Sequence, residues 1–177
     1  MPQLITTRRL LLRPLRDSDA PELARLGGDW DVACMTARIP YPYSEELARQ
    51  WMQSLAADEF VRVIELQGAL IGAVGYVAGP DASAEIGYWI GKPWWGQGFA
   101  TEAASALVRH CFTVGRFKQL TCCHFEDNPG SRRVIKKLGF SAAGRCMAWS
   151  DARHAEFPAL TYKLNRPMTA VFWRRSA

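Results

Sequence analysis

Two glycines separated by one residue precede a segment with helical periodicity, in the stretch WWGQGFAT at residues 94–101. The first backbone N–H groups of a helix have no partner within the helix, and the helix dipole adds roughly half a positive charge there. Gly96 and Gly98 would let an anion approach this backbone without an intervening Cβ atom. The pattern predicts an anion site suited to a pyrophosphate, with a simple strand-to-helix turn as the alternative.

The spacing of these glycines excludes two other phosphate-binding motifs. The phosphate loop of nucleotide hydrolases requires Lys-Ser or Lys-Thr after its last glycine, and neither follows Gly98. The dinucleotide fingerprint GxGxxG requires a third glycine where Thr101 stands. The expected anion site is therefore of a different type.

A second stretch that could do chemistry is NPGSRRVIKKLGF at residues 128–140, where an Asn and a Ser three residues apart open a basic helical segment. Two further stretches are TTRRLLLRPLRDSDA at residues 6–20 and EIGYWIGKPWWGQGFATEA at residues 85–103. Together they resemble the GCN5-related N-acetyltransferase (GNAT) superfamily, and most closely its Rim-type branch, which includes ribosomal-protein N-terminal acetyltransferases. The resemblance covers nearly the whole chain and implies acetyl transfer from acetyl-coenzyme A to a primary amine.

The resemblance implies a coenzyme A site formed by both stretches. In the family pattern Q/R-x-x-G-x-G/A, backbone amides bind the pyrophosphate, and here Trp95 stands at the first position in place of Gln or Arg. Asn128 is expected to hydrogen-bond the pantetheine arm, and Ser131 is expected to lie near the thioester sulfur. Arg133 is expected to meet the 3′-phosphate, whereas the neighbouring lysines could equally form a solvated helix face. The implied coenzyme-binding residues are Trp89, Ile90, Gly91, Trp95, Gly96, Gln97, Gly98, Phe99, Ala100, Thr101, Asn128, Ser131 and Arg133.

Attack of an amine on a thioester requires a proton acceptor on the amine side and a donor for the departing thiolate. Glu85, at the start of the strand before the glycine turn, is the candidate base, with a surface ion pair as the alternative. Ser131 is the candidate donor, because residues 125–133 lack the tyrosine that many family members use; the alternative is a helix-capping serine. The thioester carbonyl is expected to accept a hydrogen bond from a backbone N–H between Trp89 and Gly91.

The acceptor side of the site is less defined in the sequence. The segment that caps the acceptor groove in this family contains five apolar or aromatic candidates here, Trp30, Met35, Tyr41, Tyr43 and Trp51. Of these, Trp30, Met35 and Tyr41 are expected to contact the amine together with Glu85. An aromatic-lined groove suits an N-terminal peptide, a polyamine or an antibiotic amine, whereas the same residues can also be ordinary core. The alternative function is an acyl-coenzyme A-binding or sensor module without turnover. Nucleic acid is not expected as a partner, because the sequence has no basic-aromatic RNA motif.

The elements that position these residues follow from the period of the apolar positions. Their order predicts an α/β domain built on a mixed, mostly antiparallel sheet of about seven strands flanked by about four helices. The helix at residues 99–114 is a parallel crossover, and the family resemblance implies a splayed V between the two central parallel strands. Residues 29–43 are predicted to be an irregular connection. Strands are expected at residues 9–15, 60–66, 70–78, 84–91, 119–125, 142–150 and 156–164, and further helices after Asp17 or Ser18, after Ser44 and at residues 128–140.

Length and composition fit one folded domain over residues 1–165, followed by a basic aromatic tail at residues 166–177. A net charge of +5 suits an anionic ligand. The five cysteines form no CxxC pair and no histidine lies at zinc spacing, so no metal site is expected and a reducing cytoplasm fits best. No apolar run approaches the ~18 residues of a membrane span, and the N-terminus lacks a signal-peptide core, so no membrane partner is expected. A monomer and a homodimer are both compatible with this sequence.

Overall fold

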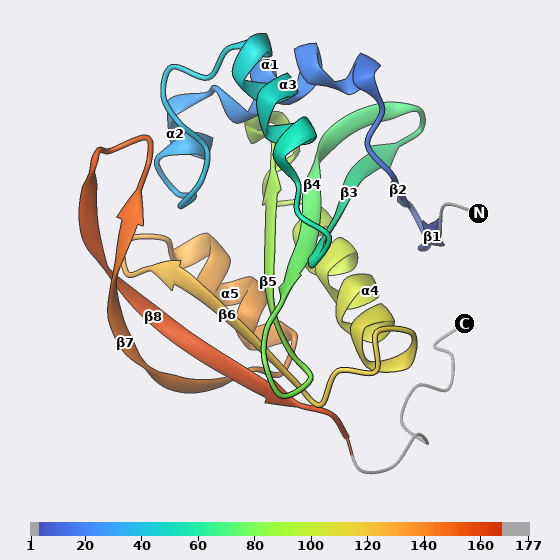
Figure 1. Cartoon of the computed structure of the whole chain (residues 1–177), viewed down its shortest axis with the longest axis vertical. Coiled ribbons are helices and arrows are strands. Elements are labelled where there is room, and N and C mark those ends of the chain that lie inside the picture. The colour runs from blue at the N-terminus through green and yellow to red at the C-terminus, as the bar shows by residue number, and fades with distance from the viewer. Residues whose placement is uncertain (1–3, 168–177) are drawn as a thin grey trace.

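An eight-stranded sheet forms the framework of the computed structural model, which describes residues 4–167. The strands lie in the order β1-β2-β3-β4-β5-β6-β8-β7, and every neighbouring pair is antiparallel except β5 and β6 (Figure 1). The predicted mixed α/β architecture with a mostly antiparallel sheet is thus confirmed. The predicted tail lies outside the described residues, apart from its first two positions. The strands are β1 Ile5–Thr6, β2 Leu11–Arg13, β3 Glu59–Leu66, β4 Ala69–Ala78, β5 Ser83–Ile90, β6 Gln119–Phe125, β7 Ser141–Ser150 and β8 Ala155–Asn165.

The additional strand arises at the N-terminal edge of the sheet. One strand was expected over residues 9–15, whereas the structure has two short antiparallel strands, β1 and β2. In the turn between them, the Leu10 N–H donates to Thr7 Oγ1 at 2.9 Å. β2 ends at Arg13, because the following Pro14 has no N–H to donate to a ladder. A side chain-to-backbone bond of this kind has no periodic signal in the sequence.

Within residues 4–167, five α-helices flank the sheet, one more than predicted. The unexpected helix, α2, is a single turn in which Asp29 Oδ1 accepts the Asp31 N–H at 2.9 Å. One turn is too short to show helical periodicity, so only an irregular connection was predicted there. None of these helices is long and apolar enough to cross a membrane. The helices are α1 Ala20–Gly27, α2 Trp30–Ala33, α3 Glu45–Ser54, α4 Phe99–Thr113 and α5 Pro129–Lys137, with short 3-10 helices at Asp17–Asp19 and Lys92–Trp94.

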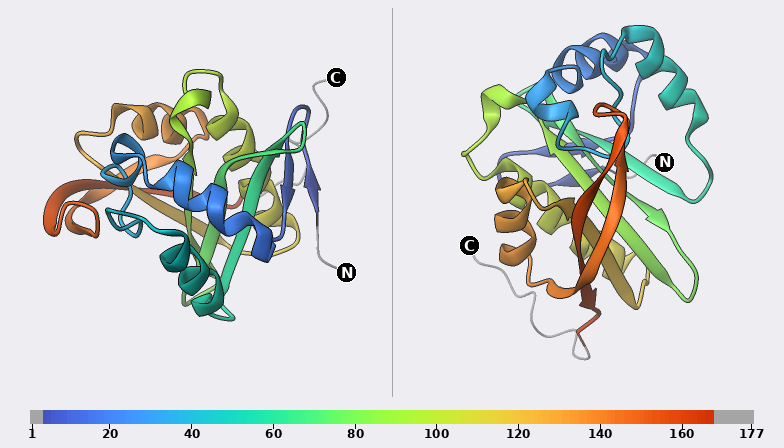
Figure 2. Two further views of the ribbon diagram at one scale, coloured as in Figure 1. Left: turned by 90° about the horizontal axis from the view of Figure 1, so that it is seen from above. Right: turned by 90° about the vertical axis from the view of Figure 1, so that its left-hand side faces the viewer.

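Neighbouring residues of β3 and β4 separate two cores on opposite faces of the sheet. Ile64 and Ile71 pack in one buried cluster with Leu107 of α4. Their neighbours Val63 and Leu70 pack in a second cluster with α1 and α3. Since successive side chains of a strand point to opposite faces, α4 covers one face of the sheet while α1 and α3 cover the other (Figure 2).

The sheet opens between its two parallel strands. Residues Ser83–Glu85 of β5 pair with Gln119–Thr121 of β6, although the strands continue to Ile90 and Phe125. Figure 1 shows the two strands diverging beyond this paired segment. The chain leaves β5 through the glycine turn into α4, and it leaves β6 into α5, so both helices begin at the open end. The predicted splayed V is therefore confirmed.

Candidate functional site

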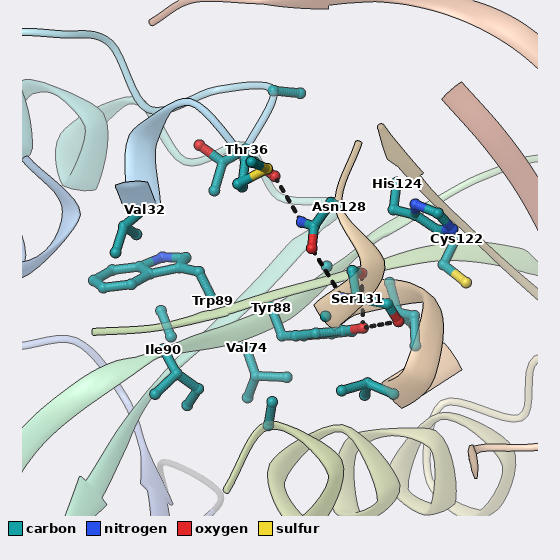
Figure 3. A pocket seen from close by; sticks show the side chains of 18 of the residues that line it. Val32, Thr36, Val74, Tyr88, Trp89, Ile90, Cys122, His124, Asn128 and Ser131 are labelled. Atoms are coloured by element: carbon teal, nitrogen blue, oxygen red, sulfur yellow. Dashed lines mark hydrogen bonds between the residues drawn. The ribbon is translucent and has the colours of Figure 1, made fainter. Parts of the chain in front are cut away.

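A cavity of about 810 Å³ occupies the opening between β5 and β6. Tyr88 and Cys122 line it from the sheet face that α4 covers, whereas Trp89 lines it from the opposite face (Figure 3). Glu85, four residues before Trp89 on β5, lines it from the same face as Trp89. Because neighbouring residues of a strand alternate between faces, the cavity passes through the sheet. The glycine turn and the start of α5 also line it, so one space joins the stretches in which the sequence predicted chemistry.

The glycine turn presents the beginning of α4 to this cavity. Gly96 and Gly98 have φ angles of 75° and 82°, in the left-handed region that favours glycine. Gly98 is the N-cap residue of α4, and no side chain caps the helix there. A Cβ atom built on Gly96 would meet no atom within 4 Å, so the space beside the turn is open. The first amides of α4 are therefore available to an anion.

Two of the predicted coenzyme-binding residues, Gly91 and Gln97, lie outside the cavity lining. Gly91 donates its N–H to the Ile71 carbonyl at 2.8 Å, so this amide is not free to polarise a thioester. The Gln97 side-chain amide donates to the Pro93 carbonyl at 3.3 Å. Successive N–H groups of an antiparallel strand alternate between its two edges, so the Ile90 N–H points toward β6 and the opening. The cavity is lined by the other predicted coenzyme-binding residues, Trp89, Ile90, Trp95, Gly96, Gly98, Phe99, Ala100, Thr101, Asn128, Ser131 and Arg133.

Trp95 holds the glycine turn against β5. Its indole Nε1 donates to the Ile90 carbonyl at 2.6 Å. The ring itself is 45% exposed, so hydrogen bonding and not burial fixes its position. Trp95, which stands where the family pattern has Gln or Arg, thus has a structural role through its hydrogen bond to Ile90.

Arg9, from the turn between β1 and β2, supports the glycine turn from outside the cavity. Its guanidinium donates to the Gln97 carbonyl at 3.1 Å and to the Glu102 carboxylate at 2.6 Å. Thr7 Oγ1 donates to the same carboxylate at 2.7 Å. Burial alone would raise the pKa of Glu102, but the hydrogen bonds from Thr7 and Arg9 outweigh it and lower that pKa. Sequence reasoning missed Arg9, because only the tertiary fold brings the N-terminal edge to this turn.

The start of α5 is held by a side chain of its own. Asn128 is the N-cap residue, and its Oδ1 accepts the Ser131 N–H at 2.9 Å while its Nδ2 donates to the Met35 carbonyl at 3.4 Å. Ser131 Oγ lies 2.9 Å from the Tyr88 hydroxyl, which comes from β5 across the opening (Figure 3). Burial raises the pKa of Tyr88 above its ordinary value. Tyr88 was not among the predicted site residues, because the family pattern has its tyrosine in the stretch that corresponds to residues 125–133, whereas Tyr88 precedes the glycine turn.

Glu85 lies where the pairing of β5 with β6 ends, and it lines the cavity. The Cys123 thiol of β6 donates to Glu85 Oε1 at 3.7 Å. Although Cys123 is an exposed residue, desolvation of its thiol first, and then the Glu85 carboxylate, raise the pKa of that thiol to about 11. At neutral pH Cys123 is therefore protonated, and it acts as a hydrogen-bond donor to Glu85 and not as a nucleophile.

Both buried histidines are held by contacts within the protein core. His124 lines the cavity, but its Nδ1 lies 2.6 Å from the Phe125 carbonyl and its Nε2 lies 3.1 Å from the Tyr162 hydroxyl. His110 stacks on Phe60 with ring centres 4.8 Å apart, and burial lowers its pKa. Over the described part of the chain, no cluster of three or more His, Cys, Asp or Glu side chains could hold a metal ion.

The acceptor side of the cavity has apolar and aromatic walls. Met35, one of the predicted acceptor contacts, lines it. The other two aromatic candidates, Trp30 and Tyr41, are exposed, lie outside the lining and pack edge to face with ring centres 5.0 Å apart. Tyr43 and Trp51, the remaining aromatic residues of the predicted capping segment, line the cavity. Both project from the α1–α3 side of the sheet, where they pack against the second core.

Arg153, in the turn between β7 and β8, fastens the far end of the acceptor side. Its guanidinium donates to the Cys34 carbonyl at 2.6 Å and to the Asp127 carboxylate at 2.7 Å. It also lies over the rings of Phe125 and Phe157, 4.9 Å and 4.5 Å from their centres. One side chain thus joins the β7–β8 turn, the end of α2 and the loop that precedes α5.

Comparison with known proteins assigns the chain to a family. The model of the acetyltransferase (GNAT) domain matches residues 9–141. The chain belongs to this family. The predicted GNAT membership is thereby confirmed, and the protein is an acyl-coenzyme A-dependent acetyltransferase.

Individual proteins similar to this GNAT chain include two named acetyltransferases. The uncharacterized N-acetyltransferase YoaA of Bacillus subtilis (strain 168) is 28% identical over 173 residues, covering 93% of this chain and 97% of that protein. The ribosomal-protein-serine acetyltransferase of Escherichia coli (strain K12) is 32% identical over 77 residues, which cover 42% of this chain and 43% of that protein. Among solved structures, Mycobacterium smegmatis RimJ in complex with CoA-disulfide has a TM-score of 0.81 at 23% identity, covering 93% of this chain and 88% of that chain. This likeness shows the same GNAT fold.

Proposed function

We propose that this protein transfers an acetyl group from acetyl-coenzyme A to a primary amine, either a protein N-terminus or a small-molecule amine. The observation that carries the proposal is the single cavity that joins the glycine turn, the start of α5 and Glu85. A donor bound at the turn and an amine bound beside Glu85 would share one space. Direct transfer in a ternary complex then needs no residue to carry the acetyl group.

The coenzyme side would be held mainly by backbone amides. The open turn at Gly96–Thr101 would bind the pyrophosphate, because its amides have no side-chain cap and its glycines leave room for close approach. Asn128 would contact the pantetheine arm, and Arg133 would meet the 3′-phosphate. The basic net charge of the chain favours the same anionic ligand.

The chemical step would use three groups around the opening. Glu85 would accept the proton of the attacking amine, directly or through a water, as the nitrogen forms its bond to the carbonyl carbon. The Ile90 N–H would donate to the carbonyl oxygen as negative charge develops there. Ser131 would donate a hydrogen bond to the sulfur as the carbon–sulfur bond breaks and the thiolate leaves with the electron pair.

The acceptor side supports an amine attached to an apolar body. Tyr43, Trp51 and Trp89 form aromatic walls on the same side of the sheet as the Glu85 carboxylate. A protein N-terminus combines an amine with a chain that extends outward, and Trp30 and Tyr41 would contact that outer part. The E. coli relative is a ribosomal-protein-serine acetyltransferase, which supports testing N-terminal peptides first.

Binding and turnover test the proposal separately. Titration calorimetry with acetyl-coenzyme A is expected to show binding, and absence of heat at about 100 µM ligand would overturn the proposal. A panel of N-terminal peptides, polyamines and aminoglycosides is then assayed for thiol release, with turnover expected for at least one class. Binding without turnover across the panel would favour the acyl-coenzyme A sensor instead. A reducing buffer is used, because all five cysteines are free and the cytoplasm is the proposed location.

A further inference from the structure

We propose that Tyr88 is a positioning residue, which donates its phenolic hydrogen to Ser131 Oγ and thereby directs the serine hydroxyl hydrogen toward the departing sulfur. The inference rests on the proposed function, in which Ser131 hydrogen-bonds the thiolate. Tyr88 belongs to β5 and Ser131 to α5, so the contact crosses the opening of the sheet (Figure 3). It connects the two elements between which the thioester would lie.

The distances allow either hydroxyl to be the donor, so the group that meets the pair from the third side decides the direction. The Tyr88 hydroxyl lies 2.9 Å from Ser131 Oγ but 3.3 Å from the Ser131 carbonyl oxygen. Each hydroxyl has one hydrogen to donate. If tyrosine donates to Oγ, the serine hydroxyl hydrogen remains available for a hydrogen bond to a third group. If serine donates to tyrosine, its only hydroxyl hydrogen is already used. A thiolate at the third position favours the first arrangement, because a hydrogen bond to a charged acceptor is stronger than one between neutral groups.

The environment of Tyr88 disfavours it as the final proton source. Burial raises its pKa above the ordinary value near 10, whereas an ordinary thiol has a pKa of about 8.5. A net transfer from the phenol through Ser131 to the sulfur would therefore run uphill. Tyr88 keeps its proton and acts only through the orientation of Ser131, while the thiolate takes its proton from solvent.

Two further contacts limit the freedom of the pair. The Ser131 N–H donates to Asn128 Oδ1 at 2.9 Å, which fixes the backbone of the serine. The Tyr88 ring packs against the buried cluster beneath α4, which fixes the phenol from the other side. A Phe at position 88 would keep this ring and remove the hydroxyl alone, so it isolates the contact.

A double-mutant cycle with the full chain tests the inference. Ser131→Ala is expected to lower kcat about 30-fold, and Tyr88→Phe about tenfold, with the Kd for acetyl-coenzyme A changed less than twofold in both. In the Ser131→Ala background, Tyr88→Phe is expected to have no further effect, because the residue it orients is gone. Thermal unfolding of each variant verifies that the protein is folded.

Tyr162→Phe is the matched control, because it removes a phenol that contacts His124 at 3.1 Å and not Ser131. Its kcat is expected to match the unsubstituted protein. An unchanged kcat in Tyr88→Phe, or a tenfold loss that recurs in the Ser131→Ala background, would overturn the inference while leaving the proposed role of Ser131 in place. If Ser131→Ala itself leaves kcat unchanged, the role of Ser131 fails, and the inference fails with it.

Discussion

The two helices that begin at the cavity start in opposite ways. At α4 the N-cap residue is Gly98, and no side chain caps the first amides. At α5 the N-cap residue is Asn128, whose side chain accepts the Ser131 N–H at 2.9 Å. Unpaired amides at a helix start are satisfied by a cap, by water or by a ligand. The contrast indicates that α4 leaves its amides to a ligand, whereas α5 uses its cap to hold a side chain in place.

Acidic side chains sharpen this contrast. Glu102 lies in the first turn of α4, where a carboxylate could fold back on the helix start. It is instead directed to Arg9 and Thr7, at 2.6 Å and 2.7 Å. Arg9 and Thr7, at the N-terminal edge of the sheet, thus bind Glu102, the acidic residue in the first turn of α4 that could otherwise compete with an anionic ligand.

Gly98→Asp, which alters the uncapped start of α4, should have the largest effect of the substitutions considered. Asp would add a Cβ atom and a negative charge where the pyrophosphate is expected, in a left-handed backbone conformation that favours glycine. The Kd for acetyl-coenzyme A, measured by calorimetry, is expected to rise at least about 100-fold, or about 2.7 kcal/mol. Unchanged affinity would mean that the ligand does not use this turn.

Gly139→Asp is the matched control for this substitution. Gly139 has φ 85°, close to that of Gly98, and a built Cβ meets no atom within 4 Å, so the backbone strain and the added charge are similar. It follows the end of α5 and lies outside the cavity lining. Its affinity for acetyl-coenzyme A is expected to stay within about threefold of the original.

Glu102→Gln tests how much the Glu102 carboxylate, bound by Arg9 and Thr7, contributes to stability, and how this contribution depends on pH. Glu102 has a lowered pKa in the folded protein, so its contribution is fully present above the unfolded value near 4.5 and is lost as pH falls through the folded value. At pH 7 the free energy of unfolding of the variant, measured by urea titration, is expected to be about 1.5 kcal/mol lower, because charge-assisted hydrogen bonds are lost. The difference should shrink below pH 4.5, and a constant difference down to pH 3 would contradict this account.

Asn128→Ala should have the smallest effect, since it removes one cap. The free energy of unfolding is expected to fall by about 1 kcal/mol, measured by urea titration. Asn128→Asp keeps a cap oxygen and should recover most of this loss, although it cannot donate to the Met35 carbonyl. Equal losses in both variants would show that the contact with Met35, and not the cap, stabilises this helix start.

Sequence reasoning reached the coenzyme side of the cavity because its residues are local. The turn at residues 94–101 and the pair Asn128 and Ser131 each lie within one short stretch, where spacing alone specifies the geometry. The central strands and the longer helices were predicted within a residue or two for the same reason, because periodicity is a local signal. The family model then confirmed the class of enzyme.

The residues that were missed come from long-range pairing. Tyr88 reaches Ser131 only because β5 and α5 face each other across the opening, and Arg9 reaches Gln97 across 88 positions of sequence. Arg153 likewise connects to Cys34 from a turn 119 positions away. No local pattern marks such contacts, and this also explains why the acceptor side was predicted less completely than the coenzyme side.

The passage of the cavity through the sheet has a consequence for substrate binding and product release. Its lining includes residues from both faces of β5, so the two substrates of the proposed reaction would enter from opposite faces of the sheet. Neither substrate would then block the route of the other, and no order of arrival would be imposed. Free coenzyme A would leave by the entrance through which the donor came and would compete with that donor alone. Product inhibition would then follow the supply of acetyl-coenzyme A and not that of the amine.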